Sequence, residues 1–169
     1  ENMAKQNHDF FKEKKPWSEV KDELLGCYLK PYLQKILHTK HPVVYVDCFA
    51  GKGVFEDGKP GSPLIALRTM KECLEQTKME NCDIQPYFID VNYAEDLRRN
   101  LHEFTRVNIV SGRYEEQITG MLSSKNGCNV FLYVDPYGIK ALDCSLFDAF
   151  ASQRFNSIEL LINMNSFGF

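Results

Sequence analysis

The sequence predicts an α/β fold built around a mostly parallel, doubly wound sheet of about five strands, and three observations support this prediction. Short apolar runs typical of buried strands alternate along the chain with segments of helical periodicity. Three of these runs end in an acid, at Asp47, Asp90 and Asp135. A turn containing Gly51 and Gly53 follows the first run. Because right-handed crossovers bring the carboxyl ends of parallel strands to one edge, we expect a ligand crevice there.

Each expected element has a local pattern that predicts it. The expected strands cover residues 43–46, 87–90, 107–110, 130–135 and 158–162. A helix is expected after each of the first four strands, because helical periodicity follows each of them. These helices are one capped by Ser62 with Pro63 at its first position, one capped by Asn92, one over residues 114–122 and one from about Asp143 to Ala151.

Residues 1–41 are expected to form a polar arm and a helical extension, and residues 42–169 the α/β domain itself. The helix of the extension is expected to begin at Ser18 and to be kinked or split at Pro31. Its core-facing stripe is expected to comprise Val20, Leu24, Tyr28, Tyr32 and Ile36. In an alternative interpretation, Trp17 and the tyrosines form an exposed surface for a nucleic acid or a cofactor edge, together with Lys21, Lys30 and Lys35.

Composition limits the classes of function that fit the chain. A length of 169 residues can bury one substantial core, and 44% hydrophobic with 25% charged residues is ordinary for a globular protein. The net charge of -3 excludes a globally basic protein, so any nucleic-acid surface would be local. We expect no signal peptide and no membrane span, and therefore a soluble cytoplasmic protein. The six cysteines form no C-x-x-C pair, so no metal site is expected.

The segment from Asp47 to Gly53 has the pattern D-x-x-x-G-x-G, which places glycines where the backbone can approach a ligand closely. A dinucleotide fold would require a third glycine where this chain has Glu56. The long connection over residues 54–61 also separates the turn from the next helix start, where a pyrophosphate would bind. A nucleoside with a zwitterionic tail and no phosphate fits better, and S-adenosylmethionine is such a ligand.

In these features the chain resembles the class I methyltransferases. The resemblance implies that the glycine loop holds the methionine end of S-adenosylmethionine, that the acid closing the second strand holds the ribose hydroxyls, and that residues after the third strand lie near the adenine. The residues assigned to the cofactor in this way are Asp47, Phe49, Ala50, Gly51, Gly53, Asp90, Val91, Arg113 and Tyr114. For Asp90, the alternative is a helix cap or a surface acid.

The segment Asp135-Pro136-Tyr137-Gly138 follows the fourth strand, where amino-methyltransferases carry the residues that meet the target atom. It resembles the D-P-F-G of a group of tRNA guanine-N2 methyltransferases. The resemblance implies that Asp135 and the Pro136 carbonyl accept the hydrogens of an exocyclic amine, while Tyr137 stacks on the flipped base. These three residues are therefore the predicted catalytic residues. The alternative is an acid that ends a buried strand before a proline turn.

Taken together, several motifs resemble the three-Cys-motif partner proteins, a prokaryotic family classed with the methyltransferases. The motifs are Phe11-Lys12-Glu13-Lys14-Lys15-Pro16-Trp17-Ser18 with Lys21, the segment 47–53, Asp57-Gly58, Gly61-Ser62-Pro63-Leu64-Ile65-Ala66-Leu67, the segment 135–138 and Leu160-Leu161-Ile162-Asn163-Met164-Asn165. The resemblance implies a Rossmann-like methyltransferase fold and a partner protein bearing a three-cysteine motif. Because a complete sheet of this class has seven strands, we expect the chain to be an N-terminal portion that lacks the last two.

The sequence therefore predicts an S-adenosylmethionine-dependent methyltransferase that acts on an exocyclic amine of a nucleic-acid base, with RNA favoured over DNA. Two alternatives stay open. One is a methyltransferase of small molecules or protein side chains. The other is a non-catalytic, cofactor-binding scaffold for a three-cysteine-motif protein.

Overall fold

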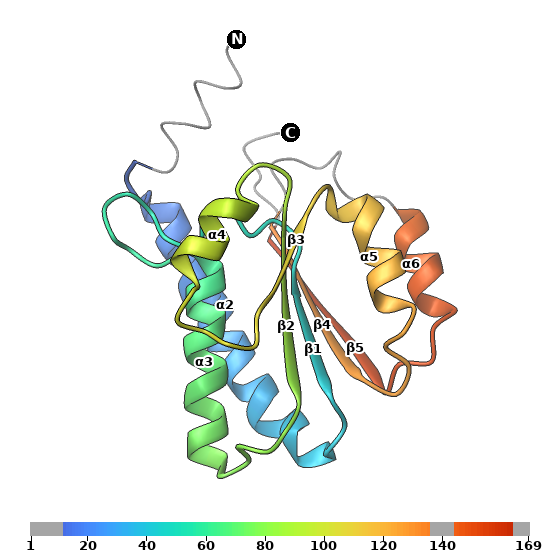
Figure 1. Ribbon diagram of the computed structural model, residues 1–169. Helices are drawn as coiled ribbons and strands as arrows, with labels where there is room; N and C mark the ends of the chain where they lie inside the picture. Colours follow the sequence, from blue (N-terminus) through green and yellow to red (C-terminus); the bar gives the residue numbers. More distant parts are fainter. Residues whose placement is uncertain (1–11, 136–143, 164–169) are drawn as a thin grey trace.

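The computed structural model describes residues 12–135 and 144–163, and these residues form one five-stranded sheet with helices on both faces (Figure 1). The strand order is β3-β2-β1-β4-β5 and every pairing is parallel. The strands are β1 (Val43–Asp47), β2 (Ile84–Asp90), β3 (Asn108–Ser111), β4 (Asn129–Val134) and β5 (Ser157–Ile162). The predicted doubly wound α/β fold with five parallel strands is confirmed.

Two helical layers enclose the sheet. Helices α2 (Pro16–Ile36), α3 (Ser62–Thr77) and α4 (Ala94–Asn100) cover one face, and α5 (Tyr114–Leu122) and α6 (Cys144–Ala151) cover the other (Figure 1). A short 3₁₀ helix, η1 (Leu37–Thr39), joins α2 to β1. Among the described residues, no helix is both long enough and apolar enough to cross a membrane.

The two central strands are buried along their whole length, which explains their nearly continuous apolar sequence. On the α2 and α3 side, the ring of Tyr45 on β1 stacks on Phe131 of β4 at 5.7 Å and meets Phe88 of β2 edge-on at 6.1 Å. Aromatic rings of three neighbouring strands thus form the centre of this core. On the opposite face, α5 packs through Ile118 and Leu122.

Helix α2 differs from its prediction in its start and its buried face, and Pro31 does not split it. It begins at Pro16 with Lys15 as N-cap, and it runs through Pro31 without a break. Its buried residues are Ser18, Leu25, Leu29 and Leu33. Of the predicted stripe, Tyr32 and Ile36 are partly buried, whereas three members face solvent.

Four apolar side chains of α2 are exposed, and we call them the outer α2 face: Trp17, Val20, Leu24 and Tyr28, whose exposed fractions lie between 41% and 56%. Both the outer α2 face and the buried stripe of Leu25, Leu29 and Leu33 have the spacing of an amphipathic helix face, so periodicity alone does not show which of them is buried. Packing of α2 against α3 and β4 selects the leucine stripe. The structure thus corrects the predicted orientation of the helix.

Two other predicted helix caps are wrong. Helix α3 is capped by Gly61, and Ser62 is its first residue; α4 is capped by Tyr93 rather than Asn92. The Ser62 hydroxyl instead donates to the Asp47 carboxylate at the end of β1, and the backbone amide of Asn92 donates to the Asp90 carboxylate at the end of β2. The predicted start of the last helix at Asp143 lies outside the described residues.

The orientation of α2 can be tested with two leucine variants. Replacing Leu29, which is fully buried, with alanine should lower the free energy of unfolding by about 2–5 kcal/mol, because a cavity is left in the core. Leu24→Ala removes the same atoms from a side chain that is 54% exposed, and should change the free energy of unfolding by about 0.5 kcal/mol or less. Urea unfolding measures both; equal losses would contradict the assigned buried stripe.

Candidate active site

The three predicted strand-terminal acids lie on neighbouring strands at one edge of the sheet. Asp47 is the last residue of β1 and Asp90 the last of β2, while Asp135 directly follows the last residue of β4. Strand β1 lies between β2 and β4, and Asp47 is in register with Phe88 and Tyr133. The parallel sheet therefore brings together three acids that are far apart in sequence.

Asp47 is completely buried and organises the turn that follows it. Its Oδ2 accepts a hydrogen bond of 2.6 Å from the Ser62 hydroxyl at the start of α3, and its Oδ1 accepts one of 3.3 Å from the Phe49 amide. The pKa of Asp47 is raised to about 7, mainly by burial; these two hydrogen bonds oppose the rise, and the negative charges of Asp135 and Asp22 add to it. Through these two hydrogen bonds, Asp47 links the turn after β1 to the start of α3.

The glycine loop needs its glycines for conformation as well as for space. Gly51 and Gly53 have φ of 66° and 80°, in the left-handed region that side chains disfavour. A Cβ on Gly53 would lie 3.3 Å from Cδ2 of Leu97 on α4. The Gly53 carbonyl accepts a hydrogen bond of 2.8 Å from the Gly61 amide, which closes the connection over residues 54–60. The loop is thus held from both sides.

Asp90 ties the end of β2 to the glycine loop. Its Oδ2 accepts a hydrogen bond of 2.8 Å from the Gly51 amide, and its Oδ1 accepts bonds of 2.8 Å from the amides of Asn92 and Tyr93. The two segments assigned to the cofactor are therefore in direct contact. The hydrogen bonds from Asn92 and Tyr93 agree in part with the alternative prediction of a helix cap, because Asp90 also shapes the turn before α4. Its assignment to ribose hydroxyls stays a prediction.

Of the five remaining cofactor candidates, three lie in or against the glycine loop and two are exposed. The rings of Phe49 and Tyr114 lie 4.9 Å apart, which connects the glycine loop to the first residue of α5. The Arg113 side chain is 65% exposed, with its Nε 3.8 Å from Glu115. Val91 is 57% exposed. Ala50 is buried, and its amide donates to the Ile89 carbonyl at 3.0 Å.

The residues at this edge fit a nucleoside without phosphates. A carboxylate at the end of β2 suits a pair of hydroxyls, and aromatic side chains beside the loop suit a purine. Helix α3 begins only at Ser62, so its N-terminus does not directly follow the glycine turn as it would at a pyrophosphate site. Within residues 12–135 and 144–163, no group of three histidine, cysteine or acidic side chains is arranged to hold a metal ion.

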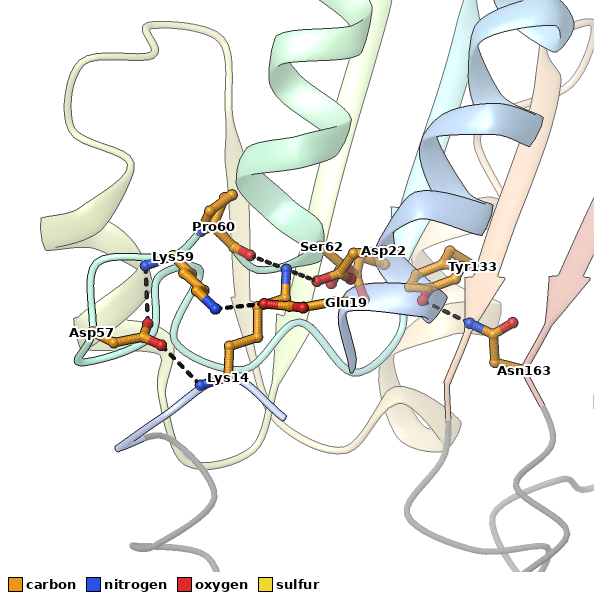
Figure 2. A network of polar contacts seen from close by, with 10 residues as sticks. Lys14, Glu19, Asp22, Asp57, Lys59, Pro60, Ser62, Tyr133 and Asn163 are labelled. Atoms are coloured by element: carbon orange, nitrogen blue, oxygen red, sulfur yellow. Dashed lines mark hydrogen bonds and ion pairs between the residues drawn. The ribbon is translucent and has the colours of Figure 1, made fainter. Parts of the chain in front are cut away.

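Sequence reasoning missed a polar network that joins the N-terminal segment to this edge. The Lys14 ammonium lies 2.8 Å from the Pro60 carbonyl and 2.5 Å from Asp22, and its backbone amide donates to Asp57 at 3.0 Å (Figure 2). Lys59 pairs with Glu19 at 2.5 Å. These contacts fasten the 54–61 connection onto the start of α2. No local pattern marks the contacts of Lys14 with Asp57 and Pro60 or of Lys59 with Glu19, because each of these joins residues 40 or more positions apart.

Asp135 has a partner from the same helix. The Lys21 ammonium donates to its Oδ1 at 2.7 Å, and 26% of the Asp135 side chain is exposed. Burial raises the pKa of Asp135, and the hydrogen bond and charge of Lys21 lower it. The other two predicted catalytic residues, Pro136 and Tyr137, lie outside the described residues.

Comparisons with known proteins support the fold. No protein-family model matches the chain, and no curated protein matches it in sequence. Among solved structures, the chain is similar to one described as "Putative methyltransferase yhhF from Escherichia coli", with a TM-score of 0.54 over 89% of this chain and 71% of that chain. The sequence identity is 16%, so the similarity establishes a methyltransferase-like, Rossmann-like fold. Membership of the three-Cys-motif partner family stays a prediction.

The buried Asp47 should give the protein a characteristic pH dependence. Its pKa is about 7 in the folded state and about 3.9 in an unfolded chain. Between these values the folded state holds a proton that the unfolded state has lost, so the free energy of unfolding should fall as pH rises. The limiting slope for one proton is about 1.4 kcal/mol per pH unit.

Asp47→Asn should remove this contribution and flatten the dependence, as measured by urea unfolding from pH 4 to 8. Asp83→Asn is the matched control, because Asp83 is an exposed acid just before the opposite end of β2. Some slope should persist in Asp47→Asn, because burial also raises the pKa of Asp22 and Asp135. Identical slopes in wild type and Asp47→Asn would show that Asp47 does not hold the proton.

Proposed function

We propose that the chain is an S-adenosylmethionine-dependent methyltransferase that acts on an exocyclic amine of a nucleic-acid base, with RNA favoured over DNA. The observation that carries the proposal is the joining of the glycine loop to the ends of neighbouring parallel strands. The Gly51 amide binds Asp90 at the end of β2, and Asp135 follows the end of β4 on the other side of β1. The methyltransferase-like fold supports a methyltransferase in general.

In the proposed reaction, the bound cofactor supplies an electrophilic methyl group on a sulfonium. Residues 47–53 and Asp90 hold that cofactor, with the ring of Tyr114 on one side of the loop. The Asp135 carboxylate would accept an N–H of the target amine and so direct the nitrogen lone pair at the methyl group. The nitrogen–carbon bond would form as the sulfur–carbon bond breaks, the demethylated cofactor would leave, and the nitrogen would release a proton to solvent. Alignment of this kind supplies most of the rate, because the methyl donor is already activated.

The nucleic-acid substrate is inferred from the segment that begins at Asp135. Its similarity to the D-P-F-G of guanine-N2 methyltransferases favours RNA. The net charge of -3 means that phosphate contacts would come from a local surface. A steep loss of tRNA binding with rising salt would support this substrate class, whereas salt-independent transfer to a protein or a small molecule would favour that alternative.

Two groups of variants separate cofactor binding from transfer. Asp90→Ala should abolish binding of S-adenosylmethionine or its demethylated product in calorimetric titration, and Gly51→Val should weaken it at least tenfold, because Gly51 has a φ of 66°. Asp135→Ala should leave cofactor affinity unchanged and remove transfer of a labelled methyl group to cellular RNA.

Asp90 also holds the amides of Gly51 and Tyr93, so the melting temperature of each variant should be measured as well. In Asp90→Asn one oxygen becomes an NH2 group that faces a backbone N–H, so a lowered melting temperature of this variant would identify loss of the loop rather than loss of the ligand contact. Asp83→Ala is the control acid from the far end of β2. Cofactor affinity that survives in both Asp90→Ala and Gly51→Val would overturn the assigned pocket.

We propose, as a second candidate, a cofactor-binding scaffold for a three-cysteine-motif protein, the partner implied by the sequence resemblance. The outer α2 face favours this role, because Trp17, Val20 and Leu24 are each more than half exposed on a helix side that would ordinarily be polar. Exposed apolar side chains that gather on one surface commonly mark an interaction site.

The scaffold candidate predicts cofactor binding without turnover. Tight cofactor binding combined with no methyl transfer to RNA, DNA or protein fractions would support it. Leu24→Glu should then abolish capture of the three-cysteine-motif protein and leave cofactor affinity unchanged, with Glu23→Gln on the same exposed side as control. Methyl transfer by the isolated chain would instead favour the enzyme.

A further inference from the structure

Lys21 connects the N-terminal helix to the strand end that carries the predicted acceptor. Its ammonium donates to Oδ1 of Asp135 at 2.7 Å across a sequence separation of 114 residues. The side chains of Lys21 and Asp135 are 23% and 26% exposed. The pair is therefore partly withdrawn from water and still open to a ligand. Solvent screens such a pair less than one on the open surface, so its charges influence each other more strongly.

The charges around Asp135 come from several elements of the fold. The negative charge of Asp135 raises the pKa of Asp22 on α2 and of Asp47 on β1. Lys14, in the segment before α2, pairs with Asp22. Burial favours the neutral acid at position 135. Lys21 is the paired cation that opposes this effect.

The form of the Asp135 side chain decides what it can do to an amine. An ionised carboxylate only accepts hydrogen bonds, whereas a protonated carboxyl also presents a hydroxyl donor. An amine whose lone pair must stay free for methyl transfer needs the acceptor. A charge-assisted hydrogen bond from an ammonium to one oxygen also restricts rotation of the carboxylate. Both effects come from the same contact.

We propose that Lys21 is a positioning residue for the transfer reaction, holding the Asp135 carboxylate ionised and oriented to accept an N–H of the target amine. The inference rests on the proposed function and adds the N-terminal helix to the site. Lys21 acts through Asp135 and does not itself touch the reacting atoms. The helix of the N-terminal extension thereby contributes to the reaction as well as to packing.

The test compares Lys21→Met with Lys21→Arg in the whole chain. Lys30→Met is the matched control, because Lys30 lies on the same helix and pairs at 2.7 Å with Glu72 on α3. The first readout is the carboxyl titration of Asp135 by carbon NMR, which needs no substrate. Lys21→Met should raise the pKa of Asp135, whereas Lys30→Met should leave it unchanged.

The second readout is the pH profile of labelled methyl transfer from S-adenosylmethionine to total cellular RNA. Lys21→Met should slow transfer at neutral pH about tenfold or more. It should also move the acidic limb of the profile to higher pH, by about one pH unit for each tenfold fall in the acid dissociation constant of Asp135. Lys21→Arg should retain the wild-type limb. Cofactor affinity should stay unchanged in both variants, and Lys21→Arg should keep the wild-type melting temperature. Lys21→Met should lower the melting temperature at neutral pH but not at low pH, because a raised pKa of Asp135 in the folded state costs stability only where the carboxyl is ionised in the unfolded chain. A purely structural role would lower the melting temperature at every pH.

The outcomes distinguish this inference from the proposed function. An unchanged Asp135 titration in Lys21→Met overturns the positioning role, and so does an unchanged pH profile in an active enzyme. A wild-type chain that binds no cofactor and transfers no methyl group overturns the proposed function, and the positioning role with it. A raised Asp135 pKa together with a displaced acidic limb supports both.

Discussion

The candidate site depends on the parallel pairing of β1 with both β2 and β4. This pairing puts the ends of three strands side by side, and the turn after β1 is then anchored on both sides. The Cys48 amide donates to the Tyr133 carbonyl at 3.0 Å, and the Ala50 amide donates to the Ile89 carbonyl at 3.0 Å. The backbone of the loop therefore continues the hydrogen bonding of the sheet beyond the strands. Displacing either neighbour would release the glycine turn.

The ionisable groups at this edge lower the stability of the folded protein. Three carboxyl groups, those of Asp22, Asp47 and Asp135, interact with one another while burial raises the pKa of each. Lys14 and Lys21 each neutralise one of them. Apolar residues of similar size would give a more stable fold at such positions. Charges that are retained under these conditions are typical of functional sites, where pKa values depart from their usual range.

Much of the fold could be predicted from the sequence because its signals are local. The β4 strand is buried on both faces and is apolar from Val130 to Val134, so its burial matches its sequence. The acids at 47, 90 and 135 could be placed at one edge because parallel topology leaves no other arrangement. The helix caps were less predictable. Ser62 has the chemistry of an N-cap, but its hydroxyl binds the buried Asp47 carboxylate, and sequence alone does not show that this acceptor is nearby.

The sequence by itself determined the sheet, its strand ends and the glycine turn, because apolar runs, strand-terminal acids and glycines act through neighbouring residues. Only the tertiary structure decided which side of α2 is buried, since Leu25, Leu29 and Leu33 compete with an equally regular apolar stripe. The tertiary structure also decided the pairing of Lys21 with Asp135. An ion pair between distant segments depends on how a helix is rotated against a sheet, and that rotation is set by packing rather than by any local pattern.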